Sequence, residues 1–198
     1  MLSINQPPIS RSDVEHNRRT LLAAAAEEFV RNPEASMADV AEAADLTRAT
    51  LYRHFSNRQE LLMAIQAEAL ARATEALAAC RLEDGSALEA LQRAIDSLSS
   101  HGARFRGVLM QAPDLNPDFL RQRAQVLAPL VGVIKRGQAE GYIRSDLSPD
   151  WIVTALASLL VAAVRMAQTM PMPDLDISDL VFHTLVEGIA PRSSITHG

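Results

Sequence analysis

Apolar residues recur every three or four positions along most of the chain, which is the spacing of one face of an α-helix. In the first such stretch, the apolar face runs from Leu21 to Phe29 within a helix predicted from residue 12 or 13 to Arg31. Asn32 and Pro33 end this helix, because proline cannot continue the hydrogen-bond ladder. Since no segment alternates strongly enough to require a strand, the pattern predicts an all-α fold.

Two short helices follow. Ser36 is a good N-cap for the helix over "MADVAEAA", and Thr47 caps a second helix that ends near His54. Between the two, Asp45 is placed to adopt the left-handed turn conformation, which glycine would adopt at lower cost.

Longer helices make up the rest. One begins with Ser56 or Asn57 as its cap and Glu60 in its first turn, and continues to about Cys80. Proline and glycine then separate further segments. Helices are expected at residues 86–101, 103–112, 117–140, 149–169 and 176–189.

The composition narrows the class of protein. With 48% hydrophobic residues, a chain of 198 residues can form a real core. A single cysteine, Cys80, excludes an intramolecular disulfide framework and favours a reducing compartment. The N-terminal segment lacks the apolar core of a signal peptide, and the most apolar window, residues 151–164, is too short for a bilayer. We therefore expect a cytoplasmic protein without a membrane partner.

The helix predicted from Thr47 has two different faces. At about 100° per residue, Leu51 and Phe55 point together toward the core. Arginine can donate two hydrogen bonds to guanine, threonine can hydrogen-bond to a base edge or a phosphate, and alanine can contact the methyl group of thymine. The net charge of −5 is opposed locally, since residues 45–58 hold three arginines and one aspartate. Ala49, Thr50, Tyr52 and Arg53 lie on the face away from the core, with Arg48 at its flank and His54 at its other edge.

Two short helices joined by a tight turn, after a longer supporting helix, form the helix-turn-helix pattern. The stretch "MADVAEAADLTRATLYRHFSNRQELLMAI" closely resembles the DNA-binding signature of TetR-family transcriptional regulators, over about residues 14–66. "GQAEGYIRSDLSPDW" resembles the link between that family's seventh and eighth helices. Asp45 and Asn32-Pro33 stand where the family usually has glycine.

The resemblance implies a domain order and a DNA-contact set. A flexible arm (1–11) precedes a three-helix DNA-binding domain (12–57) and a C-terminal helical ligand-binding and dimerisation domain (58–198). Residues that would approach bases and nearby backbone are Thr47, Arg48, Ala49 and Thr50, with Arg53 on the same face. Residues that would hold phosphates are Ser36, Tyr52, His54 and Arg58.

For the C-terminal part, the resemblance favours a homodimer through a four-helix interface, although the same helices could pack inside one monomer. The interface residues would be Ile152, Leu156, Leu159, Leu160, Ala163, Ile177, Val181, Thr184, Leu185 and Gly188. Candidate pocket residues are His101, Phe105, Met110, Phe119, Trp151, Ser158 and Arg165, of which the aromatic residues and the methionine could equally be core. Arg165 interrupts an apolar helix and needs a partner, either an anionic ligand or a carboxylate such as Asp96 or Glu140.

These features predict a ligand-responsive regulator, most simply a repressor, that binds a near-palindromic operator in double-stranded DNA and is released by a small molecule. No metal or other cofactor and no catalytic residue is expected, since the five histidines lack His-x-x-x-His spacing and no phosphate-binding glycine loop occurs. A helical carrier that binds an apolar molecule and never DNA is the alternative. The sequence does not identify the effector or the operator sequence. It also leaves open whether the protein represses or activates, and whether one or two dimers bind each operator.

Overall fold

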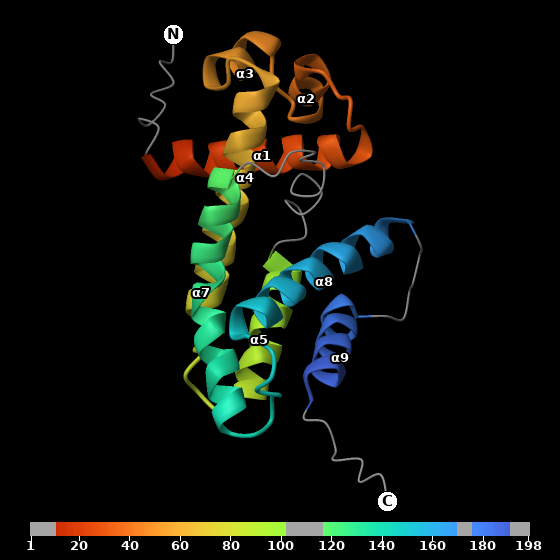
Figure 1. Cartoon of the computed structure of the whole chain (residues 1–198). Coiled ribbons are helices and arrows are strands. Elements are labelled where there is room, and N and C mark those ends of the chain that lie inside the picture. The colour runs from red at the N-terminus through yellow and green to blue at the C-terminus, as the bar shows by residue number, and fades with distance from the viewer. Residues whose placement is uncertain (1–10, 102–116, 170–175, 191–198) are drawn as a thin grey trace, which may run out of the picture. The chain divides into compact units, whose positions relative to one another are not determined.

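The computed structural model describes residues 11–101, 117–169 and 176–190, and the side chains in these ranges except at 11–17, 101, 164, 165 and 167–169. All the regular elements in these ranges are α-helices, which confirms the all-α prediction (Figure 1). Residues 1–10 of the arm expected over 1–11, and the helix expected over 103–112, lie outside the described residues, while residue 11 begins the first helix. The helices are α1 (Arg11–Arg31), α2 (Met37–Ala43), α3 (Arg48–His54), α4 (Arg58–Ala79), α5 (Ala87–His101), α7 (Pro117–Ala139), α8 (Pro149–Thr169) and α9 (Ile177–Ile189).

The chain divides into two compact units, residues 1–68 and 69–198, so the division falls within α4. The functional boundary expected between residues 57 and 58 stays a prediction. Within the described ranges, no helix combines the length and the apolar character needed to cross a bilayer.

The first unit packs α1, α2, α3 and the start of α4 around a small apolar core. Leu22 and Phe29 of α1, Leu51 of α3, and Leu61 and Ile65 of α4 have no exposed surface. Figure 1 shows α2 and α3 together on one side of α1. The two short helices, α2 and α3, need a shared core of this kind, because isolated helices of seven residues are not stable in water.

The turn between α2 and α3 has the geometry of a Schellman motif. Asp45 has φ of 54°, which confirms the left-handed conformation predicted for it. The N–H of Leu46 donates to the carbonyl of Ala41 at 2.8 Å, and the N–H of Asp45 donates to the carbonyl of Glu42 at 3.0 Å. These bonds satisfy the last carbonyls of α2 and fix where α3 begins.

Carboxylates stabilise the beginnings of several helices. At α2, Ser36 and Asp39 form a capping box, in which each side chain accepts a hydrogen bond from the other's backbone N–H. At α4, the side chain and the backbone N–H of Ser56 donate to Glu60 Oε2 at 2.6 and 2.7 Å. The Ser56 hydroxyl and then its N–H lower the pKa of Glu60 from 4.5, because both bonds favour the ionised carboxylate.

We expect Glu60→Gln to destabilise the chain at neutral pH and to matter less in acid. The pKa of Glu60 is lowered by folding, so its contribution is present above pH 4.5 and is lost as pH falls through the folded-state pKa. Urea unfolding midpoints at about pH 7 and about pH 3 should therefore show a difference between wild type and variant that shrinks in acid. Glu187→Gln, at an exposed carboxylate of α9, is the control. A difference that stays constant with pH would contradict this role of Glu60.

The second unit has its own larger core, formed by the facing sides of α5, α7, α8 and α9. Close packing depends on Gly137 of α7, because a Cβ there would lie 2.6 Å from Cδ1 of Ile143 and 3.1 Å from Cβ of Ala87. The fully enclosed residues include Leu91, Ile95, Leu130, Ile134, Ile152 and Leu156. The second unit therefore has a closely packed apolar core of its own.

Candidate nucleic-acid interface

Helix α3 turns one face inward and the other to solvent. Leu51 has no exposed surface and Phe55 is 4% exposed, so the inward pair is as the helical spacing predicts. The aromatic ring on the opposite face, Tyr52, is 51% exposed. The exposed neighbours of Tyr52 are Arg48, Ala49, Arg53 and His54, with Thr50 half-buried.

Hydrogen bonds between side chains order the first turns of α3. Thr47 is the N-cap, and its Oγ1 accepts from the N–H of Thr50 at 3.2 Å. The two threonine hydroxyls lie 2.9 Å apart, and Nη2 of Arg53 donates to Thr50 Oγ1 at 3.1 Å. This chain of bonds holds Arg53 in a defined position on the outer face before any partner arrives, which lowers the ordering entropy of binding.

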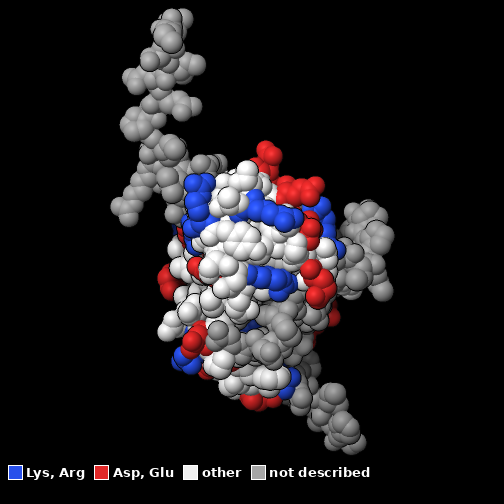
Figure 2. All heavy atoms as spheres, turned by 90° about the horizontal axis from the view of Figure 1, so that it is seen from above, with Lys and Arg blue, Asp and Glu red and all other residues white. Residues whose placement is uncertain are grey.

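The charge on this face is mixed. Figure 2 shows arginine side chains spread among uncharged surface, with acidic side chains on more than one side of them. Asp39 of α2 is an acid that interacts with this helix: its pKa is lowered first by the backbone N–H and hydroxyl of Ser36 and to a smaller extent by the charge of Arg48. Sequence reasoning did not single out Asp39, although the Ser-x-x-Asp spacing of a capping box was its signal.

Two residues predicted to hold phosphates bond to their own chain in this structure. The Ser36 hydroxyl donates to Asp39 Oδ2 at 2.8 Å. Nη2 of Arg58 donates to the carbonyl of Pro33 at 2.6 Å, and its guanidinium carbon lies 4.7 Å from the ring centre of Phe29. Arg58 thereby joins the start of α4 to the end of α1 and to the turn before α2. The phosphate contacts predicted for Ser36 and Arg58 stay predictions.

Replacing Arg58 tests whether this residue braces the domain or contacts a DNA phosphate. If it braces the domain, Arg58→Ala should lower the free energy of unfolding by about 1–2 kcal/mol, the sum of one cation–π contact and one hydrogen bond. The slope of log affinity against log salt should stay unchanged, whereas loss of a phosphate contact would reduce it by about 0.9. The control is Gln59→Ala, the adjacent exposed residue. A reduced slope with unaltered stability would assign Arg58 to the DNA instead.

The structure describes the side chains of three predicted ligand-pocket residues, Phe119, Trp151 and Ser158, and the predicted pocket role of the whole set stays a prediction. Phe119 is buried in α7, Trp151 is 60% exposed at the start of α8, and the exposed Ser158 donates to the carbonyl of Thr154. Phe105 and Met110, and the side chains of His101 and Arg165, lie outside the described residues. The two carboxylates suggested for Arg165 are engaged elsewhere: Asp96 accepts from Gln92, and Glu140 accepts from the N–H of Ala87.

The predicted dimer residues fall into two groups. Thr184 and Gly188 are exposed, while Leu159, Leu160 and Ile177 are half-buried. The others are enclosed by their own chain, so a partner could touch them only after rearrangement; they are Ile152, Leu156, Ala163, Val181 and Leu185. The interface stays a prediction.

A short capped helix that displays basic, hydroxyl and aromatic side chains, held on a second short helix by a tight turn, defines a helix-turn-helix protein. The sequence profile of the family described as "Bacterial regulatory proteins, tetR family" matches residues 21–65, which include α2 and α3. The HTH-type transcriptional regulator NfxB of Pseudomonas aeruginosa is 30% identical over 141 residues, 68% of this chain and 73% of its own. The chain belongs to the TetR family and is a DNA-binding transcriptional regulator.

Other relatives extend the similarity along the chain. The HTH-type transcriptional repressor LfrR of Mycolicibacterium smegmatis is 26% identical over 192 residues, covering 94% of this chain and 97% of its own. A crystal structure of LfrR in complex with proflavine superposes with a TM-score of 0.74 at 24% identity, over 90% of this chain and 99% of that one. The regulator PfmR from Thermus thermophilus gives a TM-score of 0.71 at 24% identity, over 89% of this chain and 98% of that one. These structures share the all-α fold of both units.

Proposed function

We propose that the protein is a repressor that binds a near-palindromic operator as a homodimer and is released by a small molecule. The observation that carries the proposal is the solvent face of α3, where exposed Arg48 and Tyr52 flank the ordered Thr50–Arg53 pair. Repression is favoured because LfrR, similar over nearly the full length, is named a repressor.

On this proposal α3 is the recognition helix and lies in the major groove. Arg48 and Arg53 reach base edges, with Thr47, Ala49 and Thr50 beside bases and nearby backbone. Tyr52 and His54 hold phosphates at the groove margin. The acidic total charge of −5 makes this local surface decisive, since no general positive field attracts DNA.

A homodimer supplies the second recognition helix. Two copies of α3 about 34–36 Å apart would read two half-sites one helical turn apart. The outward sides of α8 and α9 are the proposed contact, where half-buried Leu159 and Leu160 accompany exposed Thr184 and Gly188. A Cβ at Gly188 would meet nothing within 4 Å in the single chain, which leaves room for another backbone to approach.

A ligand acts by favouring one of two separations of the recognition helices. Its effect on operator affinity equals its differential affinity for the two states. The solved complex of LfrR contains proflavine, and this supports proposing a small-molecule effector for the present chain.

The test is a titration of purified protein against labelled DNA from upstream of its own gene, followed by anisotropy at several salt concentrations. A scrambled duplex of the same composition is the control, and the stoichiometry reports one or two dimers. Preference for the native duplex, with an affinity that falls steeply with salt, is the expected result. Equal binding to both duplexes, and to duplexes selected from a random pool, would refute sequence-specific regulation.

A further inference from the structure

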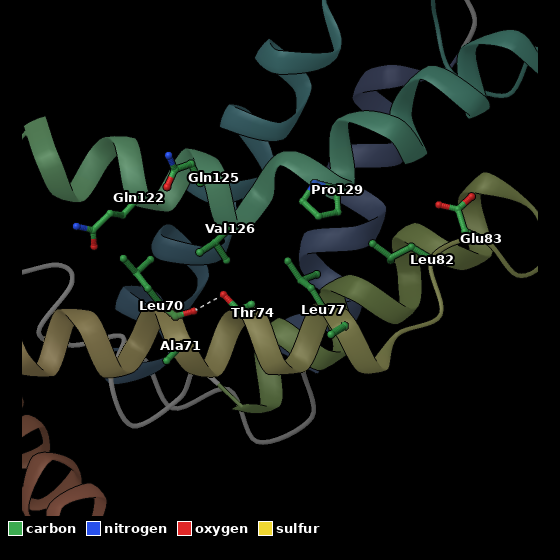
Figure 3. A pocket seen from close by; sticks show the side chains of 11 residues that line it. Leu70, Ala71, Thr74, Leu77, Leu82, Glu83, Gln122, Gln125, Val126 and Pro129 are labelled. Atoms are coloured by element: carbon green, nitrogen blue, oxygen red, sulfur yellow. Dashed lines mark hydrogen bonds between the residues drawn. The ribbon is translucent and has the colours of Figure 1, made fainter.

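A groove of about 660 Å³ runs between α4 and α7 in the second unit. Its walls are mainly aliphatic, and Figure 3 shows Leu70, Leu77 and Val126 turned into it from the two helices. The volume lies within the usual range of small-molecule sites, about 300–1,000 Å³. The lining residues are Leu70, Ala71, Thr74, Leu77, Ala78, Leu82, Glu83, Gln122, Gln125, Val126 and Pro129. None of the described pocket candidates from the sequence, Phe119, Trp151 and Ser158, is among them.

The polar groups of the groove are mainly hydrogen-bond acceptors. Pro129 stands inside α7 and has no N–H to give to the carbonyl of Gln125, one turn earlier. Both residues line the groove, so the carbonyl that Pro129 leaves without its helical partner belongs to the turn of α7 that borders the groove. Thr74 does not add a donor, because its hydroxyl already donates to the carbonyl of Leu70 at 2.9 Å. The side-chain amides of Gln122 and Gln125 can serve as either donor or acceptor.

The charge at the groove is negative. Glu83 lines one end, and no arginine or lysine is among the described lining residues. Nearby Arg136 lies 3.3 Å from Glu83 and 3.6 Å from Glu140, so these three groups together carry one net negative charge. The Arg136 guanidinium is also fixed by donation to the carbonyl of Leu82 at 2.9 Å. An anionic ligand would therefore meet repulsion without a free basic partner here, whereas a cation would be attracted.

We propose that this groove binds an apolar cation that carries N–H donors, such as a polycyclic aromatic amine. The aliphatic walls would cover the rings, the Gln125 carbonyl would accept an N–H, and Glu83 would face the charge. The inference rests on the proposed ligand response, because it names the chemical class of the effector and the place where it binds.

The first experiment measures direct binding to the full chain without DNA, by fluorescence anisotropy of two dyes with one xanthene frame. A cationic rhodamine with secondary amino groups should bind at least about tenfold more tightly than anionic fluorescein. Equal binding of the two dyes, or tighter binding of fluorescein, would overturn the proposed ligand class.

Two variants locate the site. Ala78→Trp fills the groove from α4 and should weaken rhodamine binding about tenfold, while Ala79→Trp, at the next exposed alanine outside the lining, should not. Pro129→Ala restores the N–H that bonds the Gln125 carbonyl, so it should raise the thermal midpoint and yet weaken rhodamine binding several-fold. A binding loss in a more stable protein cannot come from misfolding. Unchanged affinity in both groove variants would overturn the site.

Release of DNA is measured separately, by adding rhodamine to the protein–operator complex. Rhodamine that binds in the groove and lowers operator affinity supports both proposals. Rhodamine that binds there and leaves operator affinity unchanged supports the groove and its ligand class, but contradicts the proposed ligand-induced release.

Discussion

The double variant Arg48→Ala/Tyr52→Ala should bind operator DNA about 100-fold more weakly than the wild-type chain. Each good arginine–base pair contributes about 1–3 kcal/mol of discrimination, and a charge-assisted or hydroxyl contact to phosphate adds to this. Both side chains are exposed on α3, with Tyr52 at 51%, so neither supports the core. Thermal stability should therefore change little.

The matched control is Arg121→Ala/Tyr142→Ala in the second unit. It removes the same two side-chain types, and Tyr142 is 54% exposed, close to Tyr52. Anisotropy titrations of both double variants against the same duplex measure the effect. If operator affinity is equal in the two variants, α3 is not the recognition helix, and the helical carrier becomes the better interpretation of the residues.

Phe29→Ala should give the largest loss of stability, about 3–5 kcal/mol in the free energy of unfolding. The ring has no exposed surface, so its removal leaves a cavity between α1 and its neighbours. It also removes the face against which the Arg58 guanidinium lies at 4.7 Å. The bracing of the turn at Pro33 is then weakened together with the core, and operator binding should fall as well.

Urea unfolding followed by circular dichroism measures the stability of this variant, and hydrogen exchange locates the change. Amides of α1 to α3 should exchange faster, while those of α5, which lies in the other unit, should keep their protection. Phe29→Leu is the control, since it keeps most of the apolar volume and should lose much less. A loss below about 1 kcal/mol in Phe29→Ala would contradict a central role for this ring.

The order and type of the helices were predictable from the sequence alone. Caps, proline and glycine mark the ends of helices locally, so the predicted bounds agree closely with the eight helices in the described ranges. The same local rules placed Asp45 in the left-handed region and turned Leu51 and Phe55 inward while Tyr52 faces solvent. The family was also evident, because its signature lies within one continuous stretch.

What packs against each helix was decided only by the tertiary structure. Periodicity shows that α8 and α9 have apolar faces, but Ile152 and Val181 prove to be enclosed by their own chain. The bond from Arg58 to Pro33 joins residues 25 positions apart, and the groove joins α4 to α7, with α5 between them in the sequence. A long side chain has several partners within reach, and helical spacing cannot choose among them. The fold makes that choice by fixing which backbone groups lie nearby.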